Sequence, residues 1–213
     1  MEGPRFPGYA LLEIAYDWYE QGVTPIPLHH ASKHPAVFWR DWALQRPPWP
    51  VIAREFITPF YRGIGVLMGG ERGLTVLDFD MPLPWIHWQR RTGIRSYTVR
   101  TARGYHVYVY LEHPPTQTLS MAGGVGEVKG TGYVVAAPSV HASGHQYTAL
   151  PDYPARPLVL PDLYALGVQL ELPPARPTVT TPEPPPICSS DSPSLIDTIK
   201  ERLPLTQFLS RYT

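Results

Sequence analysis

The chain has 213 residues, of which 43% are apolar, and its 18 basic and 18 acidic side chains leave no net charge. This size and composition predict a globular protein with a substantial core, and the charge balance excludes a non-specific polycation, although a local basic face remains possible. The single cysteine, Cys188, excludes an internal disulfide and a cysteine zinc site, and without a membrane-length apolar run or a signal-peptide pattern we expect a cytoplasmic protein with no membrane partner.

The first part of the chain predicts an alternation of helices and strands. Apolar residues at helical spacing predict an amphipathic helix over 9–21, and Gly22 follows where a helix commonly ends. A short apolar run with two prolines predicts an edge strand over 23–28. The next loop carries Lys33, which is either a solvated charge or a ligand contact. A further helix is predicted over 51–59, where a proline ends it.

Residues 63–68 and 74–80 are predicted to pair as a β-hairpin through a tight glycine turn. The second strand ends with Asp78, Phe79 and Asp80, and alternation along a strand places the two aspartates on one face. Two carboxylates this close favour a cation between them, and hard oxygen ligands suit Mg²⁺ or Mn²⁺. A solvated strand end would show the same short pattern, so Asp-x-Asp alone is a weak signal.

After the aspartates, residues 84–93 predict a helix, and residues 96–101 and 105–111 predict two strands. Strict alternation in the second strand places three polar aromatic side chains on one face, namely His106, Tyr108 and Tyr110. His106 follows a glycine at the start of its strand, which makes it either a packed residue or a functional one.

The same region is basic, because no acidic residue occurs between Met81 and Leu111 while five arginines do: Arg90, Arg91, Arg95, Arg100 and Arg103. The planar guanidinium group matches phosphate oxygens, so the cluster favours a phosphate-bearing partner. A solvated helix face is the alternative for the first three. The wider basic segment is predicted to follow the backbone of a nucleic-acid template, and Arg100 or Arg103 could also meet a triphosphate.

A glycine-rich loop over 121–126 precedes Glu127 and Lys129, which share one face of a short strand. Glycines beside charged side chains let a triphosphate approach the backbone closely, although no Walker loop is present. A buried strand is predicted over 133–137. Two polar residues follow it on a common side, Ser139 and His141.

The composition changes after Leu150, where prolines become frequent. We therefore predict a catalytic domain over 1–170 and a semi-extended linker over 171–192. Residues 193–213 resume a helical apolar pattern that is too short to fold alone, so they are predicted to begin a second module.

The order of these motifs resembles the archaeo-eukaryotic primase superfamily, and specifically the bifunctional DNA primase/polymerase (prim-pol) domains of plasmids, phages and other mobile elements. The resemblance covers about residues 8–150 and includes VLDFD, GYHVYV and GEVKGTGYVVAAPSVHASGHQY. It implies an α+β fold, in which an RRM-like antiparallel sheet carries the motifs and packs with a smaller N-terminal α/β unit.

The resemblance also implies a role for each motif. The catalytic and metal ligands for two Mg²⁺ or Mn²⁺ ions would be Asp78, Asp80 and Glu127. The residues that bind the nucleoside triphosphate would be His106, Lys129, Ser139, His141, Arg103 and Lys33. Independently of the resemblance, the basic segment predicts that the template is bound by Arg90, Arg91, Arg95 and Arg100. Two departures stand out: Glu127 follows a glycine instead of an apolar residue, and Gly104 replaces the serine that usually lies two residues before the histidine.

These roles imply an enzyme of DNA replication that makes and extends primers on single-stranded DNA from NTPs or dNTPs. A replication-initiator module that binds nucleic acid with weak or no catalysis, and a two-metal nuclease, are the alternatives. A tyrosine near the sugar could exclude ribonucleotides, and the candidates are Tyr108, Tyr110 and Tyr133. Residues 193–213 resemble the first helix of a zinc-binding or helical accessory module, which implies that the natural protein continues into a further module or a helicase.

Overall fold

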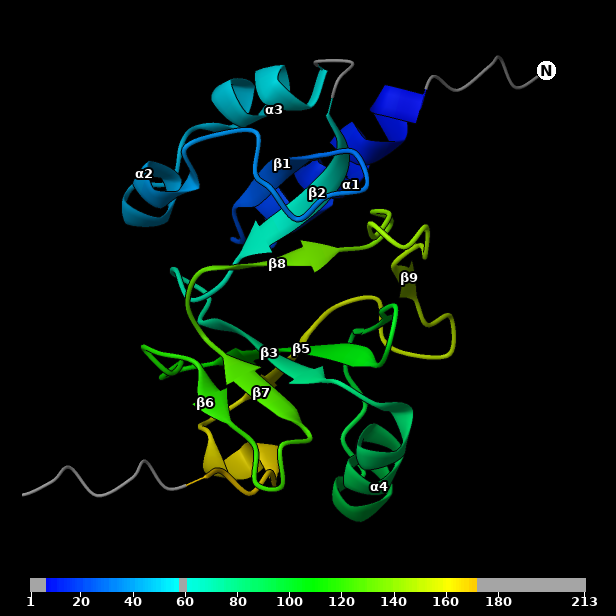
Figure 1. Cartoon of the computed structure of the whole chain (residues 1–213). Helices are drawn as coiled ribbons and strands as arrows, with labels where there is room; N and C mark the ends of the chain where they lie inside the picture. The colour runs from blue at the N-terminus through cyan, green and yellow to red at the C-terminus, as the bar shows by residue number, and fades with distance from the viewer. Residues whose placement is uncertain (1–6, 58–60, 172–213) are drawn as a thin grey trace, which may run out of the picture. The chain divides into compact units, whose positions relative to one another are not determined.

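The computed structural model describes residues 7–57 and 61–171, which form a mixed α/β fold with antiparallel sheets and few helices (Figure 1). These residues belong to one compact unit that extends to Leu172. The predicted module at 193–213, and the predicted linker beyond residue 171, lie outside the described residues.

The elements in chain order are α1 (Pro7–Glu20), β1 (Pro25–His29), α2 (Trp39–Leu44), α3 (Trp49–Ile57), β2 (Tyr61–Leu67), β3 (Leu74–Phe79), α4 (Pro82–Thr92), β4 (Thr98–Arg100), β5 (Tyr105–Leu111), β6 (Leu119–Ser120), β7 (Gly126–Lys129), β8 (Tyr133–Ala136), β9 (Thr148–Ala149), β10 (Leu158–Leu160) and the 3-10 helix η1 (Tyr164–Leu166).

The smaller sheet has the order β1-β2-β8, and α1 and α3 pack beside it. The apolar spacing that predicted the first helix is used for this packing, because Leu11, Ala15 and Trp18 are all buried on one side of α1. The chain turns at Gly22 with a φ of +80°, a conformation that glycine adopts without strain. β1 lies at the edge of this sheet, as its two prolines predict.

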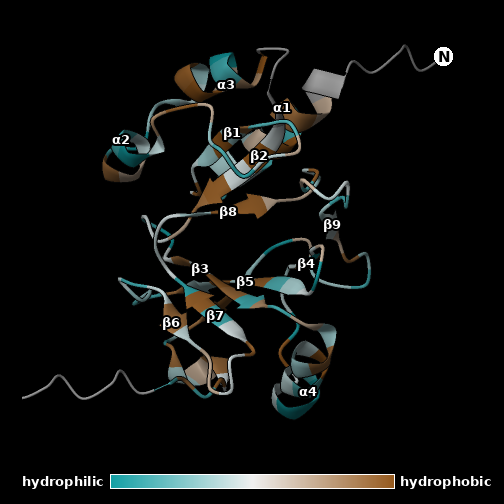
Figure 2. Ribbon diagram, in the orientation of Figure 1, coloured by the Kyte–Doolittle hydropathy of each residue, from teal (hydrophilic) through white to brown (hydrophobic). Residues whose placement is uncertain are grey.

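The larger sheet has the order β6-β7-β3-β5-β4-β9, and β10 pairs in parallel with the second half of β5. Both faces of its central strands are buried. On β5, Tyr108 and Tyr110 contribute to one core, while Val107, Val109 and Leu111 contribute to the other, so the predicted alternation is confirmed. The strands β2, β8 and β3 are largely hydrophobic (Figure 2).

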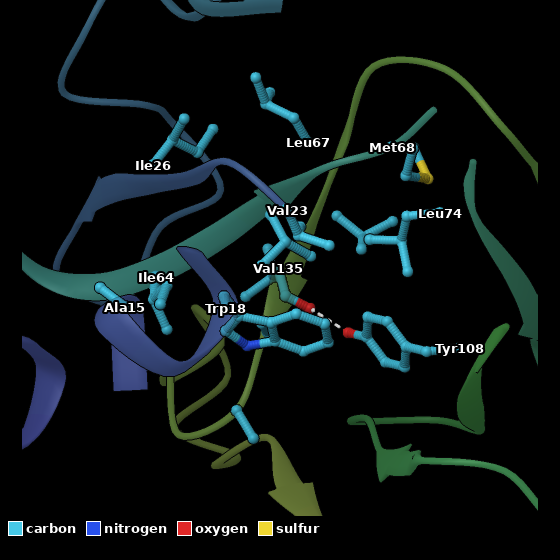
Figure 3. Close-up of a cluster of buried hydrophobic side chains, with 14 of the residues drawn as sticks. Ala15, Trp18, Val23, Ile26, Ile64, Leu67, Met68, Leu74, Tyr108 and Val135 are labelled. Carbon is cyan, nitrogen blue, oxygen red and sulfur yellow. Dashed lines mark hydrogen bonds between the residues drawn. The ribbon is translucent and has the colours of Figure 1, made fainter. Parts of the chain in front are cut away.

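One core lies between the two sheets and contains most of the buried side chains of α1, β1, β2 and β8. In this core the ring of Trp18 meets that of the partly buried Tyr97 edge-on, at 5.5 Å between centroids. The hydroxyl of Tyr108 donates a hydrogen bond of 3.2 Å to the carbonyl oxygen of Val135, which ties β5 to β8 across this core (Figure 3). The two sheets are therefore held together by apolar packing and by a buried hydrogen bond.

The second core covers the other face of the larger sheet and is built against α4 and η1. Trp85 and Trp88 of α4 are buried there with Leu166. The indole nitrogen of Trp88 donates a hydrogen bond of 2.7 Å to the carbonyl oxygen of Leu166. The segment that follows β10 is thereby fixed to α4.

The predicted hairpin of 63–68 with 74–80 is wrong. β2 pairs with β1 and β8 in the smaller sheet, whereas β3 pairs with β5 and β7 in the larger one, and only the bridge between Gly69 and Leu74 joins the two segments. The glycine turn carries the chain from one sheet to the other instead of folding it back. Side-chain alternation shows which face of a strand is buried but does not identify the strands that pair with it. The passage of the chain from one sheet to the other could therefore not be predicted from the local sequence.

No helix in the two described ranges has both the length and the hydropathy needed to cross a bilayer.

Candidate active site

Three neighbouring strands of the larger sheet bring the predicted acidic and basic residues together. Asp78 on β3 lies opposite His106 on β5 and opposite Glu127 on β7. Lys129 follows Glu127 by two residues, so it lies on the same face of β7. Because Leu74 and Val76 point into the core between the sheets, Asp78 continues that face of β3 beyond the apolar residues.

These side chains form an ion-pair network centred on Asp78. The Nζ atom of Lys129 lies 2.6 Å from Oδ2 of Asp78 and 3.1 Å from Oε2 of Glu127. The Nε2 atom of His106 lies 3.3 Å from Oδ1 of Asp78. The side chains of Asp78 and His106 are only 22% and 8% exposed, so solvent and salt screen their interactions less than those of surface pairs.

The network keeps Asp78 and Lys129 charged. Burial alone would raise the pKa of Asp78, but the hydrogen bonds and positive charges of His106 and Lys129 outweigh burial and hold this pKa well below its ordinary value. Burial would likewise lower the pKa of Lys129, but Asp78 and Glu127 raise it above its ordinary value. At neutral pH the arrangement is therefore two carboxylates that hold one ammonium group between them.

The second aspartate, Asp80, follows the end of β3 and faces the loop between β4 and β5. Its Oδ1 atom lies 3.2 Å from a terminal nitrogen of Arg103. The two side chains are 48% and 81% exposed, so this pair is solvated and contributes little to stability. Arg103 thus lies beside Asp80 and remains free to change partners, and its predicted contact with a triphosphate stays a prediction.

Two glycines let the adjoining segments approach β3 closely at this point. A β-carbon on Gly104 would lie 1.8 Å from the carbonyl oxygen of Phe79, and one on Gly126 would lie 2.1 Å from the carbonyl oxygen of Asp78. Both distances are far below van der Waals contact. A larger residue at either position would not fit in this backbone arrangement.

Replacing Gly104 with alanine is therefore expected to lower the free energy of unfolding by about 3 kcal/mol, because the strands must separate to admit the methyl group. Urea denaturation measures this change. Gly70→Ala is the matched control, since Gly70 has a φ of +62° and no atom lies within 4 Å of the point that a β-carbon would occupy there. Its cost should be only the backbone strain of about 1–2 kcal/mol. Equal losses in the two variants would show that the close approach at Gly104 has no energetic importance.

The three carboxylates are not arranged as a preformed metal site. Within residues 7–57 and 61–171, no group of three or more His, Cys, Asp or Glu side chains is placed so that it could hold a metal ion. Instead, the carboxylates form ion pairs with Lys129 and Arg103. The donor chemistry nevertheless fits a hard divalent ion, because all three residues supply oxygen ligands and each already pairs with a cationic side chain.

Tyr147, which lies beyond β8, joins two of the predicted residues. It is 4% exposed, and its ring centroid lies 5.9 Å from that of His106 and 6.3 Å from that of His141. The imidazole Nδ1 of His141 also lies 2.9 Å from the hydroxyl oxygen of Ser143. Tyr147 was not among the residues nominated from the sequence, because one tyrosine in a polar loop carries no signal of its own.

Ser139 and Lys33 are placed differently from the rest. The hydroxyl of Ser139 accepts a hydrogen bond of 2.8 Å from the amide of Ile64 and donates one of 2.9 Å to the carbonyl oxygen of the same residue. Ser139 is only 1% exposed, so it fixes its loop to β2 and its hydroxyl hydrogen is not free for a ligand. The side chain of Lys33 is exposed, and its nucleotide contact stays a prediction.

The three tyrosines considered for sugar selection all use their hydroxyls within the protein. Tyr108 donates to Val135, Tyr110 donates to the side chain of Gln21, and Tyr133 donates to the carbonyl oxygen of Lys33. Tyr108 and Tyr110 are also buried in the core between the sheets. Tyr147 is a better candidate than these two, because its hydroxyl forms no hydrogen bond within the described part of the chain.

The four arginines predicted to bind the template are all exposed, but they differ in their contacts. Arg91 donates a hydrogen bond of 2.6 Å to the carbonyl oxygen of Gly167. Arg95 donates to the carbonyl oxygen of Asp152 and lies over the ring of Tyr153. Both therefore anchor the segment after β9. The other two, Arg90 and Arg100, form no hydrogen bond or ion pair with the residues that the structure describes, and their template contact stays a prediction.

A comparison with protein-family models finds that the model Prim-Pol, described as "Bifunctional DNA primase/polymerase, N-terminal", matches residues 15–163. The match includes every residue of the ion-pair network and the loop that carries Tyr147. A search of the curated proteins gives no match.

Proposed function

Because the chain belongs to the family of bifunctional DNA primase/polymerase N-terminal domains, we propose that it makes primers on single-stranded DNA and extends them by template-directed nucleotidyl transfer. The observation that carries this proposal is the network of Asp78, His106, Glu127 and Lys129 on three adjacent strands. We also take the larger sheet to be the RRM-like catalytic core of an archaeo-eukaryotic primase. The sheet β1-β2-β8 with α1 and α3 would be its smaller N-terminal unit.

In this proposal Asp78, Asp80 and Glu127 hold two divalent ions, Mg²⁺ or Mn²⁺. When bound, the ions would lower the pKa of the attacking 3′-hydroxyl and stabilise the charge of the pyrophosphate leaving group. The depressed pKa of Asp78 supports this role, because a ligand that is charged at neutral pH needs no deprotonation to bind a cation.

The basic residues of the site would exchange partners when a nucleotide binds. Lys129 and Arg103 pair with the carboxylates in this structure, and both have long, flexible side chains. The triphosphate offers them stronger anionic partners, and their departure frees the carboxylate oxygens for metal ions. His106 would stay in place, oriented by Asp78 and packed against Tyr147, and its imidazole would contact the phosphates.

The remaining assignments complete the proposal. His141 would line the nucleotide pocket beside Tyr147, and Lys33 would be a further nucleotide contact. The exposed guanidinium groups of Arg90 and Arg100 would bind the template backbone, with smaller contributions from Arg91 and Arg95. The substrates would be NTPs or dNTPs, the partners a single-stranded DNA template and its primer, and a following accessory module or helicase is part of the same proposal.

Synthesis on unprimed single-stranded DNA, with labelled nucleotides and Mn²⁺ or Mg²⁺, tests the proposal. We expect products from the parent chain and none from the double variant Asp78→Ala, Asp80→Ala. The double variant Asp41→Asn, Asp152→Asn is the control, because it removes two exposed carboxylates from other parts of the chain.

Extension of a supplied primer without synthesis on unprimed DNA would limit the activity to polymerisation. Absence of incorporation under both conditions would favour a nucleic-acid-binding module. Degradation of labelled DNA without incorporation would favour a two-metal nuclease.

A further inference from the structure

A cavity of about 550 Å³ lies between α1 and the segment around β9, and Tyr147, whose ring packs near His106, forms part of its wall. The side chains that define its chemistry are Asp17, Trp18, Gln21, Tyr97, Tyr147 and Arg156. Its volume is typical of sites for small organic ligands. Of these residues, the roles assigned above use only Tyr147.

Three aromatic residues, Trp18, Tyr97 and Tyr147, line the cavity. Trp18 and Tyr147 are each 4% exposed, and Trp18 is held edge-on against Tyr97 and packed beside Tyr108, as Figure 3 shows for the Trp18 and Tyr108 pair. Within the described residues, the hydroxyls of Tyr97 and Tyr147 form no hydrogen bond. Burial raises the pKa of Tyr97 to about 12, so this hydroxyl stays protonated and able to donate. Rigid aromatic walls with unused hydroxyls suit a flat, polar ring.

Two charged groups of opposite sign also line the cavity. Neither the carboxylate of Asp17 nor the guanidinium of Arg156 forms a hydrogen bond or ion pair within the part of the chain that the structure describes. Both side chains are exposed and therefore accessible. The side-chain amide of Gln21 also lines the cavity. Its orientation is fixed, because it donates a hydrogen bond to the backbone oxygen of Asp17 and accepts one from the hydroxyl of Tyr110. The cavity thus presents an acceptor, a cation and an oriented amide.

We propose that this cavity binds one nucleotide unit, with its base against the aromatic walls, an N–H edge of the base on Asp17 and its phosphate on Arg156. Aromatic side chains stack on bases of any sequence, carboxylates accept hydrogen bonds from base N–H groups, and guanidinium groups pair with phosphate. The choice of a nucleotide rests in part on the proposed function. The unit can come from a free nucleotide or from a residue of the template strand, since both present the same chemistry.

The position of Tyr147 gives this site a connection to the network. The same ring forms a wall of the cavity and packs against His106 and His141. A base in the cavity therefore restricts the ring that supports His106. Occupation of the cavity is expected to change the affinity of the active site for its incoming nucleotide, and by linkage the reverse also holds.

Binding is best measured with the double variant Asp78→Asn, Asp80→Asn in EDTA, so that no metal-nucleotide complex forms at the active site. Calorimetric titration would use nucleoside monophosphates in one arm and a short single-stranded oligonucleotide in the other. We expect saturable binding in at least one arm, weakened about tenfold or more by Arg156→Gln. Arg54→Gln, which removes an exposed arginine on α3, is the matched control and should leave the affinity unchanged.

Ala155→Trp provides a second test, because it places a ring in the cavity from an exposed position, and it should abolish the binding of monophosphates and weaken that of the oligonucleotide. Binding of monophosphates identifies a free nucleotide as the ligand, whereas Arg156-dependent binding of the oligonucleotide alone identifies the template strand. No saturable binding in either arm, or binding that Arg156→Gln and Ala155→Trp leave intact, would overturn the proposal. The assay requires no catalysis, so its result is independent of whether the chain synthesises primers.

Discussion

Replacing Lys129 with methionine is expected to tighten the binding of Mn²⁺ by the nucleotide-free protein about tenfold, and to lower nucleotide incorporation about a hundredfold. Both effects follow from its position between Asp78 and Glu127, 2.6 and 3.1 Å from their oxygens. Without the ammonium group, no lysine side chain competes with a metal ion for the two carboxylates. The same change removes a positive charge that the triphosphate would otherwise contact.

Electron paramagnetic resonance of free Mn²⁺ during a titration measures the first effect without any need for activity. Lys33→Met is the matched control, since Lys33 is an exposed lysine outside the network, and its variant should bind Mn²⁺ like the parent. If Lys129→Met bound Mn²⁺ no better than the parent, Lys129 would not be the competing cation. The absence of a preformed three-ligand group among the described residues would then need another cause.

Replacing His106 with phenylalanine is expected to raise the KM for the incoming nucleotide by about ten- to a hundredfold, with a smaller effect on kcat. Phenylalanine keeps a ring against Tyr147 but removes the nitrogen that lies 3.3 Å from Asp78. The pKa of Asp78 should rise towards its ordinary value, because the hydrogen bond and charge of His106 help to lower it. The loss of nucleotide incorporation should therefore extend to higher pH at the acidic end of the pH profile.

Steady-state kinetics on a primed template, measured across a range of pH, separates these effects. His113→Phe is the control, because His113 is exposed and lies outside the network. A large fall in kcat with an unchanged KM would mean that His106 acts on the chemical step and not on nucleotide binding.

The faces of the strands could be predicted from the sequence, because side-chain alternation is a local property. Val107 and Val109 lie in one core and Tyr108 in the other, as the pattern of β5 indicates. The partners of each strand could not be predicted in the same way. The glycine turn after β2 has the composition of a hairpin, yet β2 and β3 belong to different sheets, because the hydrophobic surface of each strand is buried by segments distant in the sequence.

The candidate site likewise combines residues that could be predicted from the sequence with contacts that could not. Asp78, His106, Glu127 and Lys129 could be nominated from motif order, and their register brings them together. That Lys129 pairs with both carboxylates was not predictable, since it depends on side-chain reach across two strands. Tyr147 and the internal bonds of Ser139 were equally inaccessible, because they arise from the return of the loop after β8 to the sheets.

The placement of β8 has a consequence for how the protein is made on the ribosome. β8 completes the smaller sheet, but it is synthesised after β3, β5 and β7, which carry the acidic residues. A nascent chain that ends before residue 133 therefore contains Asp78, Asp80 and Glu127 but lacks the strand that Tyr108 bonds across the core. The two sheets cannot mature one after the other as independent domains do during translation. The core between the two sheets is thus completed only after β8 has been synthesised.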